Sequence, residues 1–210
     1  MPADPSCPRC GSDLLAPTVM HERFECPQHG PVAPLHGPLL PAADALARLA
    51  TDSDVPFWIP WPLPGSWLFS GIQLAGGGRE PIEAAVVALT GHGMSEGPSD
   101  AMIIAEKPGT GLGAAWAGVS EPDPDLTTQP ATTKIRAAGW PTPLWHVDTP
   151  DRAAYVGEAA GCWLWFVAWP DTAWPVIDDE LRLVDLRDPA APGDVPAGAL
   201  QPRLVAGPAA

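Results

Sequence analysis

The chain has 210 residues, and its 25 acidic side chains outnumber its 11 basic ones, which gives a net charge of −14. So few lysines and arginines disfavour a general nucleic-acid binder, because phosphate contacts come mostly from these residues. No apolar run approaches the roughly 20 residues of a membrane-spanning helix, and the first residues lack the basic and apolar regions of a secretory signal. We therefore expect a cytoplasmic protein without a membrane segment.

Residues 1–36 contain two matched pairs of metal-binding residue types, Cys7-Pro-Arg-Cys10-Gly and, fifteen residues later, Cys26-Pro-Gln-His29-Gly. Each pair is typical of a tight turn, in which the glycine after the second ligand permits a positive φ. Three thiolates and one imidazole complete a tetrahedral site that suits zinc and leaves no open position. We predict a zinc ribbon with structural Zn²⁺ on Cys7, Cys10, Cys26 and His29. Ordinary thiols or disulfides are the alternative, and the missing export signal disfavours disulfides.

Residues 37–56 are predicted to be a linker with a short helix over 41–50, where Leu46 and Leu49 share one face. From residue 57 the pattern favours strands, because short apolar runs are bounded by glycine and proline. These runs predict strands over 67–74, 84–90, 101–105, 144–147, 162–169 and 181–186. Long amphipathic helices do not alternate with them, which argues against a doubly wound parallel sheet.

The predicted fold class is α+β, with an N-terminal zinc ribbon followed by a mainly antiparallel β-sheet domain with few short helices. The α+β domain covers residues 57–188, and its acidic, proline-rich stretch 120–133 is expected to be a loop. Residues 189–210 carry five prolines and few large apolar side chains, so we expect a flexible tail rich in Pro and Ala.

Two glycine motifs resemble known signatures without their context. Gly109-Thr-Gly-Leu-Gly-Ala114 fits a dinucleotide-binding pattern, but little helix and no second strand are predicted after it, so we favour a turn between strands. Gly93-Met-Ser95-Glu-Gly97 fits the pattern of a nucleophile elbow, but Pro98 follows where that motif needs a helix. A serine hydrolase with His146 and Asp148 as partners is therefore disfavoured. We assign no catalytic and no cofactor-binding residue.

Three other chemically interesting positions have plain interpretations. His146 lies in a short apolar run, which favours a packed or rim histidine over a general base. Cys162 lies in the run Cys-Trp-Leu-Trp, which favours a small buried apolar side chain over a reactive thiol. The acidic group Asp178, Asp179 and Glu180 is interpreted as a solvated turn, with capture of a divalent cation as the alternative.

The stretch from Trp58 to Trp67 combines three tryptophans with three prolines. The prolines remove N–H donors, which excludes a central strand before residue 65. We expect an extended segment that leads into the strand at Trp67. Our hypothesis is that Trp67 is buried while Trp58 or Trp61 lies at the surface as an interface anchor. Burial of all three is the alternative.

The sequence resembles a family of uncharacterised actinobacterial proteins of about this length. The residues that carry the resemblance are the zinc-ribbon-like segment and the Trp/Pro motif Trp58-Ile-Pro-Trp-Pro-Leu-Pro-Gly-Ser-Trp-Leu-Phe69. Further similar stretches are Gly111-Leu-Gly-Ala, Pro141-Thr-Pro-Leu-Trp-His146 and Trp163-Leu-Trp. The resemblance implies a bacterial cytoplasmic setting and a two-part organisation, and it assigns no activity.

Together these observations predict a non-enzymatic zinc-binding protein that acts as a protein-interaction module. The expected partner is a protein of unknown identity, with neither nucleic acid nor a membrane involved. The alternative is an enzyme or small-ligand-binding protein with a pocket in the larger domain.

Overall fold

Strands make up most of the regular structure in the computed structural model, which describes residues 4–19, 21–78, 80–92, 97–172, 177 and 180–208. Over these residues, nine strands form one sheet in the order β3-β11-β7-β8-β9-β10-β6-β5-β4, and β1 pairs with β2 apart from it. The elements, in chain order, are β1 Glu25–Cys26, β2 Gly30–Pro31, α1 Ala43–Thr51, β3 Trp58–Pro60, β4 Leu68–Gly77, β5 Glu80–His92, β6 Pro98–Glu106, α2 Leu112–Ala117, β7 Thr133–Ala137, β8 Trp140–Val147, β9 Ala153–Ala159, β10 Cys162–Trp169, β11 Arg182–Asp185 and α3 Pro202–Ala206.

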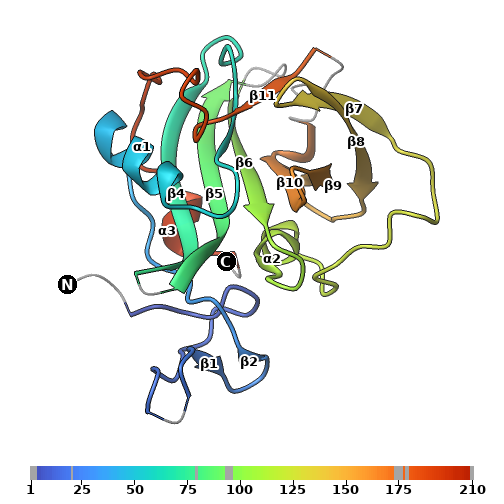
Figure 1. Cartoon of the computed structure of the whole chain (residues 1–210). Helices are drawn as coiled ribbons and strands as arrows, with labels where there is room; N and C mark the ends of the chain where they lie inside the picture. The colour runs from blue at the N-terminus through green and yellow to red at the C-terminus, as the bar shows by residue number, and fades with distance from the viewer. Residues whose placement is uncertain are drawn as a thin grey trace.

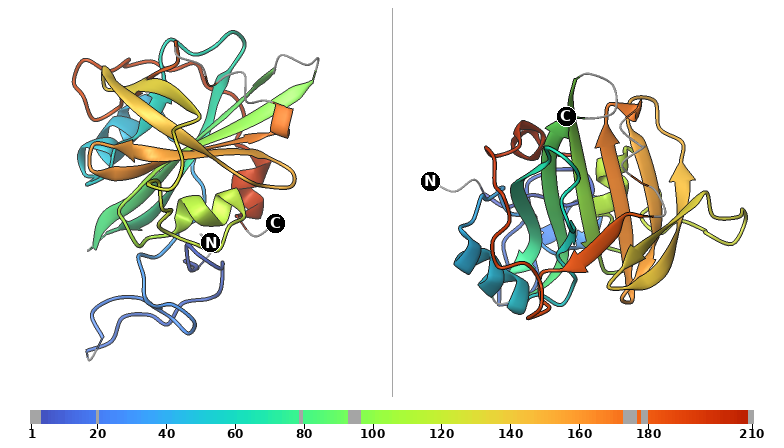
Figure 2. Two further views of the ribbon diagram at one scale, coloured as in Figure 1. Left: turned by 90° about the vertical axis from the view of Figure 1, so that its right-hand side faces the viewer. Right: turned by 90° about the horizontal axis from the view of Figure 1, so that it is seen from above.

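The nine-stranded sheet is strongly curled, as the view from above shows (Figure 2). Its neighbouring strands run antiparallel, except that β7 and β11 pair in parallel. Two helices pack on the outside of the sheet, with α2 against β6 and β10 and α3 against β4 (Figure 1). This arrangement confirms the predicted class, a mainly antiparallel sheet with few short helices after an N-terminal Cys/His segment.

Both faces of the central strands are buried. In β5, Ala85, Val87 and Leu89 belong to the core inside the curl, while alternate residues such as Val86 pack in a second core outside it. The inner core also contains Leu46 of α1, and the outer one contains side chains of α2 and α3. Strands buried on both faces are continuous apolar runs rather than alternating ones. For this reason these central strands could be predicted from the sequence.

The sequence analysis missed two strands of the sheet and one helix that packs on it. The strands β7 and β9 and the helix α2 were not predicted, and α2 lies in the stretch where little helix was expected. β9 consists largely of small residues, and α2 has only six residues, so neither carries a strong periodic signal. β7 and β8 form a hairpin that begins where the expected loop 120–133 ends.

The C-terminal segment differs from the flexible tail that we expected. The backbone of Phe69 in β4 bonds to Pro196 and Gly198, and Leu204 of α3 is 1% exposed. The side chain of Gln201 explains this docking, because its Nε2 donates to Asp100 at 2.6 Å and to Thr90 at 2.8 Å. Few apolar residues therefore suffice to hold this segment on β4.

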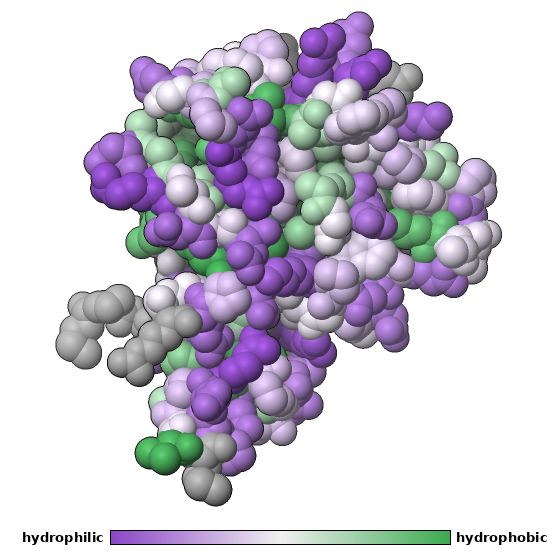
Figure 3. Space-filling model, viewed as in Figure 1, coloured by the Kyte–Doolittle hydropathy of each residue, from purple (hydrophilic) through white to green (hydrophobic). Residues whose placement is uncertain are grey.

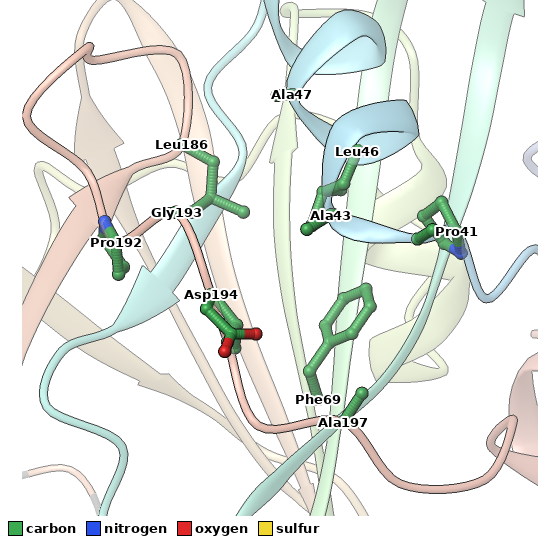
Figure 4. A pocket seen from close by; sticks show the side chains of 12 residues that line it. Pro41, Ala43, Leu46, Ala47, Phe69, Leu186, Pro192, Gly193, Asp194 and Ala197 are labelled. Carbon is green, nitrogen blue, oxygen red and sulfur yellow. The ribbon is translucent and has the colours of Figure 1, made fainter.

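The docked segment also closes a small apolar pocket of about 180 Å³ against α1 and β4 (Figure 4). Leu46, Phe69 and Leu186 project into it, and Asp194 supplies a carboxylate at its rim. Elsewhere the face seen in Figure 3 is largely polar, with apolar side chains in small separate areas. None of the helices in the described part of the chain has the length and hydrophobicity to cross a bilayer.

The Trp/Pro-rich stretch forms the short strand β3 at one end of the sheet order, in agreement with the exclusion of a central strand. Trp67 is 4% exposed and Trp58 is 1% exposed, whereas Trp61 is only partly buried. The structure therefore agrees with the hypothesis for Trp67 and leaves Trp61, not Trp58, in contact with solvent.

Candidate metal centre

The structure brings Cys7, Cys10, Cys26 and His29 together at one point. The His29 Nδ1 atom lies 3.5 Å from both Cys7 Sγ and Cys26 Sγ, and Cys10 Sγ lies 3.7 Å from Cys26 Sγ. All four potential ligand atoms lie within 4.8 Å of one another, which fits a single ion at their centre. Two of the thiols are buried and the other two ligands are partly buried. The group can therefore bind a metal ion.

Local turns position these ligands. In the first, Gly11 N donates to Cys7 O and Cys7 N donates to Ser12 O, both at 2.8 Å. In the second, Cys26 and Gly30 are paired residues of the β1–β2 hairpin, so His29 lies in its turn. Gly11 and Gly30 have φ of 68° and 69°, the positive values expected from the sequence. Short-range backbone bonds thus aim both ligand pairs at the same point.

The protein environment acts differently on two of the thiols. Burial raises the pKa of Cys7 to about 11. Burial also opposes ionisation of Cys10, but hydrogen bonds with the side chain and backbone of Ser12 outweigh it and lower that pKa to about 6. A metal ion replaces the thiol protons, so it stabilises thiolates that burial alone disfavours.

The segment with the metal centre, residues 4–36, is called here the N-terminal lobe, and it lies below the sheet in Figure 1. Arg9 comes directly before the ligand Cys10 in the sequence. Its side chain donates to the carbonyl oxygens of Gly109 and Thr110, which precede α2. Arg23 pairs with Glu83 of β5 at 3.1 Å. The backbone then continues onto the free side of β4, where His36 N donates to Leu74 O. The folded lobe is therefore anchored to the sheet at several separate points.

A family model matches residues 1–204, which include the four clustered ligands and all strands of the sheet. The chain belongs to a family of unknown function, DUF6758. This confirms the resemblance to an uncharacterised family without a known activity. No curated protein and no solved structure matches the chain.

The other candidate residues do not join the Cys/His cluster of this DUF6758 chain. His146 is 44% exposed, stacks edge-on against Tyr155, and lies 3.6 Å from Asp148. Cys162 is buried, and burial raises its thiol pKa, which agrees with a small apolar core residue. Ser95 lies outside the described residues, as do Asp178 and Asp179.

The glycine motif forms the turn into α2 and the first residues of this helix. β6 ends at Glu106, the chain turns through Gly109 and Gly111 at positive φ, and α2 begins at Leu112. The strands paired with β6 are β5 and β10, and both are antiparallel to it. A dinucleotide-binding unit needs a parallel neighbouring strand after the helix, so this turn does not belong to such a unit.

The sequence analysis missed Glu106, which is 0% exposed. Its Oε2 accepts a hydrogen bond from Leu112 N at 2.6 Å, whereas its Oε1 has no hydrogen-bond partner among the described residues. Burial raises its pKa to about 7, although the backbone N–H groups at the start of α2 favour the ionised form. The available signal is a glutamate directly after the apolar run 101–105.

The raised pKa of Glu106 makes the stability of the folded protein depend on pH. Between about pH 4.5 and pH 7 the folded protein retains a proton on Glu106 that the unfolded chain releases, so stability falls as pH rises through this range. The full effect is on the order of 3 kcal/mol. We expect Glu106→Gln to flatten the pH dependence of the unfolding free energy in denaturant titrations from pH 5 to 8. The control Glu158→Gln, at an exposed position, should leave this pH dependence unchanged. If the unfolding free energies of both variants depended on pH in the same way, the raised pKa would not belong to Glu106.

Proposed function

We propose that this chain is a non-enzymatic zinc-binding module in which zinc holds the N-terminal lobe and an exposed hairpin contacts a protein partner. The donor set supports zinc, because thiolates with an imidazole in a four-ligand group suit this ion. Four protein ligands leave no position for a substrate, so the metal has a structural role. A reducing compartment such as the cytoplasm would keep the thiols available for the ion.

Trp140 is the observation that supports the interaction role. It is 76% exposed at the start of β8, and the sequence analysis did not single it out as an interface residue. The loop between β7 and β8 consists of Ala138 and Gly139, both at positive φ, as in a type I′ turn. Arg136 Nη1 donates to Gly139 O at 3.3 Å, and Thr142 Oγ1 donates to Trp140 O at 3.2 Å. A braced turn therefore holds a large aromatic side chain in solvent.

Tryptophan is enriched among the residues that dominate binding energy at protein interfaces, where truncation to alanine often costs about 2 kcal/mol or more. We therefore expect Trp140→Ala to weaken binding of the partner by at least about tenfold while the melting temperature stays close to that of the native chain. The partner would be identified by affinity capture and quantitative mass spectrometry, purified, and titrated against each variant.

The matched control is Val205→Ala, which removes another exposed apolar side chain on the distant helix α3. It should leave the dissociation constant unchanged. The proposal fails if the native chain retains no specific partner, or if Trp140→Ala and Val205→Ala bind it equally well.

A further inference from the structure

The basic side chains of this acidic protein are not paired evenly. Of its eleven lysines and arginines, Arg79 lies outside the described residues, which leaves ten. Six of them pair with a carboxylate: Arg23, Arg48, Lys107, Arg152, Arg187 and Arg203. Arg9 donates to two backbone carbonyl groups instead. Within the described part of the chain, Lys134, Arg136 and Arg182 form no ion pair.

These three cations lie together on one surface, which we call the basic face. Lys134 and Arg136 are the exposed positions of β7, and they alternate with the buried residues Ile135 and Ala137. Arg182 on β11 is also exposed and is paired with Arg136 across the two parallel strands. Since paired residues of neighbouring strands point to the same side of a sheet, the two guanidinium groups share one face. β7 and β11 lie at the upper right of Figure 1.

Folding alone does not favour this arrangement. Like charges on directly opposite residues destabilise a sheet, and 25 acidic residues in the chain offer many possible partners. Six other cations have such a partner, whereas the basic face has none among the described residues. Arg136 donates one hydrogen bond to Gly139 O, but no carboxylate among the described residues neutralises its charge or those of Lys134 and Arg182, so the face can bind an anionic group from outside.

We propose that the basic face binds an acidic segment of the partner protein. This inference rests on the proposed function and adds the chemistry of the partner. Trp140 is paired with Ala137 at the end of the hairpin that carries Lys134 and Arg136, so its side chain leaves the sheet on the side opposite to these two cations. An extended acidic peptide can place carboxylates along β7 and β11, while Trp140 contacts a separate part of the partner. A nucleic acid is the less favoured ligand, because contacts to its phosphate backbone come mostly from lysines and arginines, and the described part of this face offers three of them.

The test uses the full zinc-loaded chain and a fluorescein-labelled deca-glutamate peptide as the probe. Anisotropy titrations at low salt should show binding that weakens as salt is added, because exposed charges are screened. Arg136→Ser and Arg182→Ser should each weaken it about three- to fivefold, as expected for exposed charge pairs. The matched control Arg48→Ser removes one exposed cation that pairs with Asp44 on α1, and it should bind like the native chain.

Further arms distinguish the alternatives. A serine–glycine peptide of equal length should not bind, and oligo-dT should bind more weakly than deca-glutamate. The proposal is overturned if deca-glutamate does not bind, if Arg48→Ser weakens binding as much as Arg136→Ser, or if oligo-dT binds more tightly. It is also overturned if sedimentation velocity shows that the basic face mediates self-association. A partner that depends on Trp140 but not on Arg136 or Arg182 would refute this inference and leave the proposed function intact.

Discussion

Replacing one ligand, as in Cys26→Ser, is expected to abolish the proposed zinc binding and unfold the N-terminal lobe. Around its metal ligands the described part of the lobe has a small apolar cluster of Val32 and the partly buried Leu14, whereas its last residues, Ala33 and Leu35, pack in the outer core of the sheet. Such a cluster buries little area, whereas structural zinc contributes on the order of 10 kcal/mol in small zinc-binding peptides. The zinc content found by elemental analysis should fall from about one ion per chain to near zero. Limited proteolysis should cut between residues 12 and 25 much faster than in the native chain.

The sheet should survive this change, because its two cores contain no ligand of the metal centre. Cys162→Ala is the matched control, since it removes a buried cysteine of β10 that lies outside the Cys/His cluster. This variant should retain its zinc and the protease resistance of the lobe. If Cys26→Ser retained zinc at the native stoichiometry, the assignment of Cys26 as a ligand would be refuted.

The Cys/His cluster was predictable from the sequence because its geometry is local. Each ligand pair spans four residues, and glycine follows each pair where the chain takes a positive φ. The long central strands were predictable for a different reason. Burial on both faces leaves uninterrupted apolar runs, such as 84–90 in β5 and 162–169 in β10.

The features that the sequence did not reveal depend on contacts between distant segments. The docked C-terminal segment relies on Gln201 reaching Asp100, about a hundred residues earlier in the chain. The basic face needs Arg136 beside Arg182, which belong to strands that are far apart in the sequence. The exposure of Trp140 follows from the β7–β8 turn, whereas composition alone favours burial of tryptophan.

Gly113 is the residue of the glycine motif whose substitution should cost the most stability. It lies in α2, where glycine normally lowers helix stability by about 1 kcal/mol relative to alanine. Propensity alone therefore predicts that Gly113→Ala stabilises the protein. The packing predicts the opposite, because a Cβ at this position would lie 2.1 Å from Trp165 Cδ1 and 2.4 Å from Trp165 Cγ.

Trp165 cannot move aside easily, since it is 0% exposed on β10 in the middle of the sheet. Overpacking of this kind typically costs about 1–3 kcal/mol, and we expect Gly113→Ala to reach the upper end of this range in denaturant titrations. Gly37→Ala is the control, because a Cβ there meets no atom within 4 Å and its φ is not positive. A Gly113→Ala variant as stable as Gly37→Ala would show that α2 does not pack directly on Trp165. A destabilised variant would instead show that the motif's last glycine is required for close packing of α2 against the sheet.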